Sequence, residues 1–204
     1  MLVTSSSEVY GEPVTPVQTE ESPLNAVHSY ARVKLLGEAF FEAYHQKYGL
    51  KTCSLRYFNT YGPGQISSDY GFVVAIFIKQ VIQNQAPKIF GDGTQTRAFF
   101  FIEDNVNATI AAALSNDLHG QAINLGNSEE VTIKELADQI IKLCDKDVRP
   151  IFLPVRQGDI IHRCPDISKM KQVLNYKPKV SLTEGLKKTI TWYKNKGSEN
   201  KEEV

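Results

Sequence analysis

A tyrosine and a lysine four residues apart, Tyr30 and Lys34, are the side chains of this sequence best suited to joint chemistry. Residues four apart on a helix share a face, so both can point into one site. A tyrosine hydroxyl titrates at about pH 10, and a nearby ammonium favours the phenolate by direct attraction. The upstream serines Ser5, Ser6 and Ser7 could supply a hydroxyl to the same substrate oxygen. Such a group would form a general base for an alcohol proton.

The spacing of Tyr30 and Lys34 is not sufficient evidence by itself. Tyrosine and lysine occur at this spacing on many helices, so the pair is also compatible with an incidental placement on an amphipathic surface helix. The elements around the pair and the motifs elsewhere in the chain must therefore decide.

Strands and helices are expected to alternate around these residues. An apolar run at residues 2–4 predicts a buried strand, and residues 29–48 predict a long helix that ends at Gly49. The predicted apolar stripe of that helix consists of Leu35, Leu36, Ala39, Phe40 and Ala43. Residues 52–57 predict the next strand.

The rest of the chain continues the alternation. Thr132 and Glu135 form a capping-box pattern, which predicts the start of a helix. The predicted strands are 88–90, 98–102, 122–125 and 149–153, and the predicted helices are 72–83, 103–115, 132–143, 166–174 and 182–193. This order predicts an α/β fold with a mainly parallel sheet.

Composition excludes several classes of function. The 204 residues carry 23 basic and 23 acidic side chains, so no net charge favours binding to nucleic acid or to a membrane surface. No run is long enough to span a bilayer, and the first residues do not resemble a signal peptide. Cys53, Cys144 and Cys164 have no metal-ligand spacing, which predicts no metal site and a reduced, cytoplasmic setting.

Several motifs in order carry a resemblance to a known family. Residues 4–11 read TSSSEVYG, residues 30–34 read YARVK, and residues 56–63 read RYFNTYGP. Further matching segments are 89–97, 124–127, 156–159 and 165–167. Together they resemble the extended short-chain dehydrogenase/reductase family, and more narrowly its NAD-dependent nucleotide-sugar epimerases, dehydratases and decarboxylases.

The resemblance implies a division of the chain into two parts. Residues 1–63 would form the C-terminal part of a Rossmann-like domain that carries the catalytic motif. Residues 64–204 would mainly form a small α/β subdomain for the nucleotide sugar, with residues from about 98 to 125 returning to the Rossmann part. The implied fold is therefore a partial Rossmann-type parallel sheet with a small C-terminal substrate-binding subdomain.

The resemblance also implies catalytic roles. Tyr30 would be the catalytic base, and Lys34 would assist it while holding the nicotinamide ribose of NAD. Ser6 would share the substrate oxygen, and Glu8 occupies the position where dehydratases and decarboxylases of the family carry a glutamate. The backbone around Phe58 would contact the nicotinamide.

A second implied set binds the nucleotide sugar: Asn59, Ile89, Phe90, Arg97, Arg156 and Asp159. The asparagine would bind the diphosphate or the sugar, the arginines the diphosphate, the aspartate the ribose hydroxyls, and the Ile–Phe pair would lie by the base. Forked guanidinium donors suit phosphate oxygens. Taken singly, each residue also fits a simpler role, such as a surface cation, an exposed ion pair or a turn cap.

The resemblance leaves the reaction outcome open. Family enzymes oxidise the sugar at carbon four, and the 4-keto sugar is then epimerised, dehydrated or decarboxylated. Ser7 stands where dehydratases usually have an aspartate before the glutamate, which disfavours dehydration. Residues 6–11 and Arg163 resemble decarboxylases, whereas Gln65 after Gly64 resembles epimerases. UDP-sugar 4-epimerase and UDP-glucuronate decarboxylase both stay open.

One family motif does not occur in the sequence. No Gly-x-x-Gly-x-x-Gly turn is found, so the chain is expected to lack the glycine-rich N-terminal half and to bind NAD weakly. It could then be a non-catalytic nucleotide-sugar-binding fragment, or one subunit of a split enzyme completed by an N-terminal subunit. The resemblance also implies a homodimer formed through the helix that bears Tyr30 and Lys34.

Overall fold

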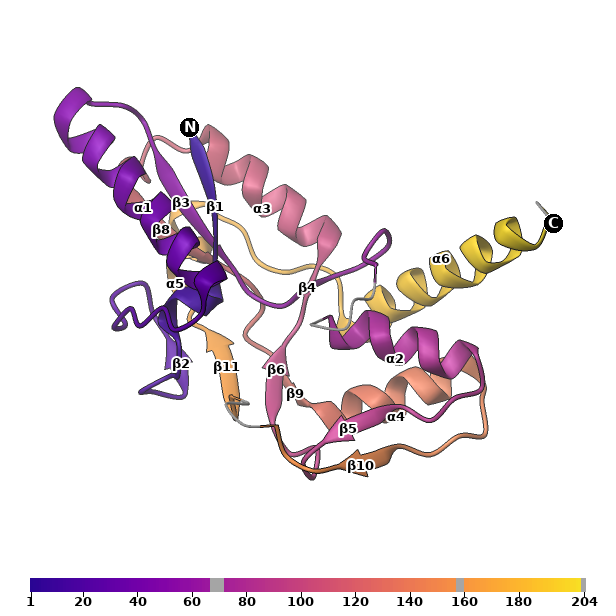
Figure 1. The fold of residues 1–204 in the computed structure, drawn as a ribbon. Helices are drawn as coiled ribbons and strands as arrows, with labels where there is room; N and C mark the ends of the chain where they lie inside the picture. The colour runs from indigo at the N-terminus through magenta and orange to yellow at the C-terminus, as the bar shows by residue number, and fades with distance from the viewer. Residues whose placement is uncertain (67–71, 157–159, 203–204) are drawn as a thin grey trace. The chain divides into compact units, whose positions relative to one another are not determined.

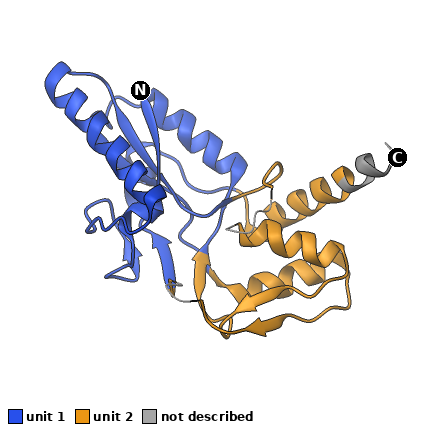
Figure 2. Cartoon of the chain, in the orientation of Figure 1, with its two compact units in different colours: residues 1–60, 98–130, 162–179 blue, residues 61–97, 131–161, 180–204 orange. Residues whose placement is uncertain are grey.

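The chain divides into two compact units, each assembled from three separate stretches (Figure 2). The computed structural model describes residues 1–66, 72–156 and 160–202, with side chains of the last helix described as far as residue 196. Unit 1 contains residues 1–60, 98–130 and 162–179, and unit 2 contains residues 61–97, 131–161 and 180–204.

Unit 1 is built on a parallel three-stranded sheet with the order β1-β3-β8 (Figure 1). Its strands are β1 (Leu2–Ser6), β3 (Cys53–Tyr57) and β8 (Gln121–Leu125). Helix α1 (Ser29–Tyr48) contacts β1 and β3, α3 (Ile102–Leu114) contacts β3 and β8, and α5 (Ser168–Val173) contacts β8. Helices separate successive parallel strands, which confirms the predicted α/β fold.

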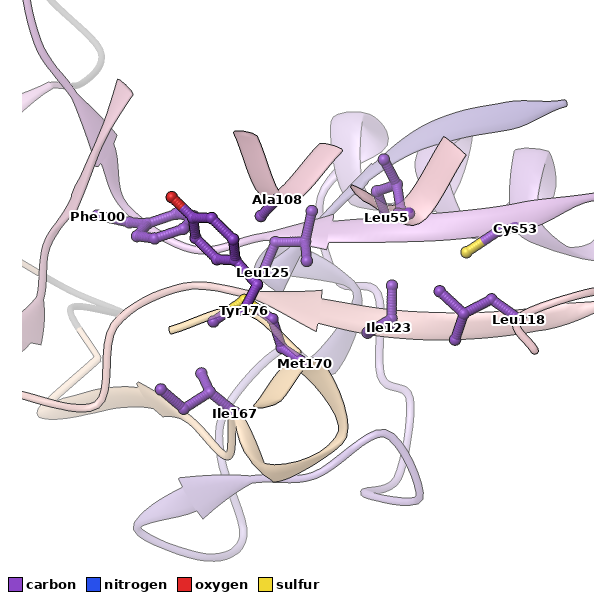
Figure 3. Close-up of a cluster of buried hydrophobic side chains, with 11 residues drawn as sticks. Cys53, Leu55, Phe100, Ala108, Leu118, Ile123, Leu125, Ile167, Met170 and Tyr176 are labelled. Carbon is purple, nitrogen blue, oxygen red and sulfur yellow. The ribbon is translucent and has the colours of Figure 1, made fainter. Parts of the chain in front are cut away.

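The two faces of this sheet differ in character because successive side chains of a strand point to opposite faces. Figure 3 shows the apolar face, where Leu55 of β3 and Ile123 and Leu125 of β8 pack with Ala108 of α3 and Met170 of α5. The opposite face carries a polar row at one level. Ser5 pairs in register with Arg56, and Arg56 pairs in register with Asn124.

Helix α1 has the predicted bounds but not the predicted buried face. Gly49 ends it in the left-handed conformation, with φ of 65°. Leu36 and Phe40 of the predicted apolar stripe are each 57% exposed, whereas Ala31 and Glu38 are buried. The stripe prediction was wrong because the buried face is centred on a charged residue that pairs with Arg56 of β3.

Several short elements of the chain were not predicted. They are η1 (Ser7–Tyr10), β2 (Val17–Gln18), β4 (Thr60–Tyr61), β9 (Glu130–Thr132) and β11 (His162–Pro165). Strand β11 runs parallel to β2. The strand predicted at residues 98–102 is instead divided between β6 (Thr96–Ala98) and β7 (Phe100–Phe101).

Unit 2 contains three mutually contacting helices and a two-stranded parallel sheet. The helices are α2 (Val73–Ile82), α4 (Ile133–Cys144) and α6 (Leu182–Glu202), and strand β5 (Lys88–Phe90) pairs with β10 (Ile151–Leu153). The predicted capping box is confirmed: Thr132 and Glu135 bond each other's backbone at the start of α4. Over the described parts of the chain, no helix is both long and apolar enough to cross a membrane.

Candidate active site

Tyr30 and Lys34 lie in the first two turns of α1, beside the end of β1. The Lys34 Nζ lies 5.5 Å from the centroid of the Tyr30 ring. It also donates hydrogen bonds to the backbone oxygen of Thr4 at 2.8 Å and to Thr4 Oγ1 at 3.2 Å. The Tyr30 side chain is 56% exposed. An anchored ammonium and an open phenol are thus brought together as the sequence predicted.

Ser6 is the last residue of β1 and the N-cap of η1. Its Oγ accepts a hydrogen bond from the backbone N–H of Glu8 at 3.2 Å, which turns the chain sharply at the strand end. Ser6 is itself buried, whereas Glu8 is half-buried. The carboxyl end of a parallel strand is a common position for functional side chains in such folds.

Glu8 forms a two-point ion pair with Arg163 of β11. Both terminal nitrogens of the guanidinium donate to the two carboxylate oxygens, with Nη2 to Oε2 at 3.3 Å. The two residues are 155 positions apart in the sequence, and the neighbouring β2–β11 pairing holds the segment that bears Arg163. The fold thereby adds a guanidinium to the predicted catalytic set.

A second polar group lies on the α1 side of the sheet and was not predicted as functional. The Arg56 guanidinium donates from Nε and Nη2 to Glu38, with Nη2 to Oε2 at 2.7 Å, and from Nη1 to the Tyr10 hydroxyl at 2.9 Å. Ser5 Oγ donates to Glu38, and the Tyr10 hydroxyl donates to Asn124 Oδ1 at 2.7 Å. We call these five residues the buried polar layer.

Burial and charge pairing act in opposite directions on the pKa values of this layer. Burial raises the pKa of the Tyr10 hydroxyl to about 12, although the charge of Arg56 acts in the opposite direction. Burial alone would lower the pKa of Arg56, but its hydrogen bonds to Glu38 and the charges of Tyr10 and Glu38 raise that pKa above its ordinary value. The arginine is therefore charged at any physiological pH.

Phe58 and Asn59 follow β3 and are held by backbone contacts. The N–H of Phe58 donates to the Leu125 oxygen at 3.0 Å, and its ring is fully buried. Asn59 has φ of 33°, a left-handed value that asparagine tolerates, and its Nδ2 donates to the Ala98 oxygen at 3.1 Å. Their contacts with cofactor and substrate stay predictions.

The other predicted substrate-binding residues belong to unit 2. The guanidinium carbon of Arg156 lies 3.6 Å from the centroid of the Phe90 ring, and the neighbouring Ile89 is buried. Arg97 Nη1 donates to the backbone oxygens of Thr96 at 2.7 Å and Ile161 at 3.4 Å. Asp159 lies outside the described residues. Unit 2 thus brings together Ile89, Phe90 and Arg156.

The parallel sheet, the Tyr30–Lys34 pair and the serine at the end of β1 define the class as the extended short-chain dehydrogenases/reductases. Residues 1–189 match the family described as GDP-mannose 4,6 dehydratase. The chain belongs to this family, which confirms membership of the NAD-dependent nucleotide-sugar epimerase, dehydratase and decarboxylase group.

Relatives of known name include both activities that the sequence left open. The chain is 38% identical to UDP-glucuronic acid decarboxylase 1 of Arabidopsis thaliana, over 96% of the chain and 45% of that protein. It is similar to the structure of UDP-glucose 4-epimerase from Thermotoga maritima with UDP-glucose (TM-score 0.90, 31% identity, 96% of this chain and 63% of that one).

A third relative binds both predicted ligands. UDP-glucuronic acid 4-epimerase from Bacillus cereus, in complex with UDP-glucuronic acid and NAD, matches with a TM-score of 0.86 and 33% identity. The match covers 95% of this chain and 61% of that chain. The chain therefore spans between about half and two thirds of the length of these relatives.

Proposed function

We propose that the chain carries the catalytic residues of a UDP-glucuronate decarboxylase, which acts through a 4-keto sugar. The observation that carries this proposal is the Glu8–Arg163 ion pair beside Ser6. A guanidinium at this position offers charge and directed donors to the carboxylate that distinguishes glucuronate from glucose. The similarity to a plant UDP-glucuronic acid decarboxylase supports the same choice.

Pairing with Glu8 suits Arg163 to decarboxylation in particular. An interaction accelerates a reaction only when it is stronger in the transition state than in the ground state. As carbon dioxide leaves, the negative charge moves away from the sugar carboxylate. An arginine without a partner would therefore stabilise the carboxylate of the ground state more than it stabilises the transition state. Glu8 moderates that attraction.

The remaining residues act at the sugar 4-hydroxyl. Tyr30 removes its proton, helped by the Lys34 ammonium, while Ser6 hydrogen-bonds the same oxygen. When bound, NAD would accept the hydride of carbon four and, after carbon dioxide has left, would return it to carbon four, so that the product is a UDP-pentose. The C5–C6 bond of the resulting β-keto acid then breaks, its electron pair passes toward O4, and carbon dioxide leaves. Tyr30 and Ser6 donate to O4 as this charge develops, and carbon five takes up a proton.

The described residues fit one end of NAD. The Lys34 ammonium lies beside the Tyr30 ring and is anchored to β1, a donor suited to ribose hydroxyls at the predicted nicotinamide end. The sequence contains no Gly-x-x-Gly-x-x-Gly turn for the pyrophosphate, so we infer that this chain alone binds NAD weakly. Completion by a glycine-rich subunit, or a homodimer through α1, stays part of this proposal.

We assign the nucleotide to residues of unit 2. Phe90 and Arg156 offer a flat aromatic and guanidinium surface for a base and its diphosphate. Ile89 is assigned a place by the base from the family resemblance, although its side chain is buried. Arg97, Asp159 and Asn59 complete the assignment on the strength of the family resemblance. Three buried free thiols, Cys53, Cys144 and Cys164, support a cytoplasmic location.

A UDP-sugar 4-epimerase is the second candidate. Two of the solved structures named above are 4-epimerases, and Gln65 after Gly64 follows the epimerase pattern. Both reactions share the oxidation at carbon four, so Tyr30, Lys34 and Ser6 would have the same roles in either enzyme. The two reactions differ at carbon six, which decarboxylation releases as carbon dioxide and epimerisation retains.

The test is turnover of UDP-glucuronate, UDP-glucose and UDP-galactose with NAD, with products resolved by NMR. The chain is assayed alone and mixed with a polypeptide that supplies a glycine-rich half of this family. We expect a UDP-pentose from UDP-glucuronate, and none with the Tyr30→Phe variant. Formation of UDP-galacturonate would establish the epimerase instead, and no turnover in either arrangement would overturn the catalytic proposal.

A further inference from the structure

Glu38 occupies an unusual place for a helical carboxylate. It follows Lys34 by one helical turn and Tyr30 by two, so all three lie along one side of α1. Unlike the exposed Tyr30, Glu38 is buried. Burying a charge without partners is costly, so its surroundings must compensate.

Those surroundings belong to the strands that carry the active-site serine and its neighbour. Ser5 of β1 donates to Glu38, and Arg56 of β3 donates two further bonds, with Nε to Oε1 at 3.0 Å and Nη2 to Oε2 at 2.7 Å. Ser5 directly precedes Ser6. Helix α1 therefore holds β1 at two consecutive residues, Thr4 through Lys34 and Ser5 through Glu38.

Apolar packing accounts for only part of the orientation of α1 in unit 1, through the buried Ala31 and through Leu35, which packs against the cluster of Val9, Tyr10 and Phe58. The α1 residues Leu36 and Phe40 are exposed, and its N-cap His28 makes no side-chain capping bond. The helix nevertheless lies close to β1, since a Cβ added at Gly37 would come within 3.3 Å of Val3 Cγ2. The polar contacts of Glu38 lie on the same side of the helix as this apolar packing and add directional bonds to it.

We propose that Glu38 is a positioning residue, which through Ser5 and Arg56 holds α1 in the rotation that presents Tyr30 and Lys34 to the end of β1. A slip by one residue would turn the helix by about 100° and shift it by about 1.5 Å, which would take Lys34 away from Thr4. Buried ion pairs contribute weakly to stability compared with apolar replacements, so specifying one arrangement is their better-supported use.

This inference rests on the proposed function for its kinetic consequence, but the geometry can be measured separately. The key variant is Glu38→Met with Arg56→Met, which removes both charges and retains volume. Glu38→Gln keeps a hydrogen-bonding group of the same shape. Glu42→Gln is the matched control, because Glu42 lies one turn further along α1, is exposed, and contacts Gln46.

Two readouts are taken from each folded variant. The first is the NMR contact between the Lys34 ε-methylene and the Thr4 methyl group. The second is kcat and KM for UDP-glucuronate, in whichever arrangement of the chain turns over. For the double Met variant we expect loss of the NMR contact and a fall in kcat of about 100-fold, with KM little changed. In Glu38→Gln we expect a weaker NMR contact and a smaller fall in kcat. In Glu42→Gln we expect neither readout to change.

An unchanged NMR contact and unchanged kcat in the double Met variant would overturn the proposal. If that variant does not fold, an undiminished contact and kcat in Glu38→Gln would overturn it. If the unmodified protein turns over none of the nucleotide sugars, the proposed function fails, and the NMR contact alone decides whether Glu38 positions α1.

Discussion

Unit 1 contains two arginine–glutamate pairs of the same chemistry in different surroundings. In the buried polar layer, the side chains of Arg56 and Glu38 are 5% and 9% exposed. At the strand end, the side chains of Arg163 and Glu8 are 11% and 33% exposed. The first pair lies between a helix and a sheet, and the second lies in reach of solvent beside Ser6. Because their residue types are the same, the proposed positioning role of the first pair and the proposed substrate-binding role of the second rest on these surroundings.

The two pairs also differ in whether their arginine can bind a ligand. Arg56 is committed to protein groups, because it contacts Glu38 and the hydroxyl of Tyr10. A guanidinium has five N–H donors, and the contact with Glu8 engages two nitrogens of Arg163. A ligand carboxylate can therefore bind the remaining donors of Arg163 without disrupting contacts between α1 and the sheet. The comparison makes four predictions.

The largest expected effect is on folding stability. Arg56→Ala leaves the Glu38 carboxylate buried without its cation, which should lower the free energy of unfolding by about 3–5 kcal/mol. Arg163→Ala should lower it by about 1 kcal/mol or less, because its partner is partly exposed. Urea unfolding of both variants measures the difference. Equal losses would remove the distinction between the pairs.

The second effect is on recognition of the sugar carboxylate and is expected at the Glu8–Arg163 pair. Arg163→Gln removes charged hydrogen bonds worth about 1.5–3 kcal/mol, so kcat/KM for UDP-glucuronate should fall by roughly 10- to 100-fold. The affinity for UDP, measured by calorimetric titration, is the control, since UDP has no sugar carboxylate. A matching loss of UDP affinity would show that Arg163 binds the nucleotide instead.

The third effect is the pH dependence of stability that Tyr10 of the buried polar layer contributes. Burial raises the pKa of Tyr10 from its ordinary 10.0 to about 12, so the folded state retains the phenol proton longer than the unfolded state. This contribution to stability is complete below pH 10.0 and is lost progressively as pH rises toward about 12.

Near pH 11 the part of the loss in the free energy of unfolding that is due to Tyr10 should be about 1 kcal/mol relative to neutral pH. Urea unfolding of the protein and of the Tyr10→Phe variant at both pH values measures it. The Tyr10→Phe variant lacks the titrating hydroxyl. Its free energy of unfolding should therefore fall by about 1 kcal/mol less between the two pH values than that of the unmodified protein. Identical pH dependence in the two proteins would contradict a buried, neutral Tyr10.

The smallest expected change is in the stability of the double variant Glu38→Met with Arg56→Met. Its free energy of unfolding should lie within about 1 kcal/mol of the unmodified protein or above it, since a whole buried pair can be replaced by apolar groups at little cost. A double-mutant cycle with Glu38→Ala and Arg56→Ala would show strong coupling. If the free-energy losses of the two single Ala variants add up to that of the double Ala variant, Glu38 and Arg56 act independently.

Local patterns explain what the sequence predicted. The bounds of α1 follow from a helical pattern closed by Gly49, and the Tyr30–Lys34 contact follows from spacing within one helix. The motifs around Ser6 and Glu8 identified the end of the first strand as the site. Each of these signals lies within a few neighbouring residues, where spacing and geometry are directly linked.

The features that the sequence did not predict depend on contacts between distant segments. The burial of Glu38 was not predicted, because the apolar stripe was the guide used for the buried face of α1. This burial depends on Arg56, which belongs to a strand formed later in the chain. The pairing of Glu8 with Arg163 depends on strands as short as two residues, which have no measurable periodicity.

The most direct test of the account follows the carboxyl carbon of UDP-glucuronate labelled with ¹³C at carbon six. The chain, alone or completed by a glycine-rich half, is incubated with the labelled substrate and NAD. The account predicts that the label appears as carbon dioxide and that a UDP-pentose without label accumulates. Retention of the label in UDP-galacturonate, with no labelled carbon dioxide, would contradict it.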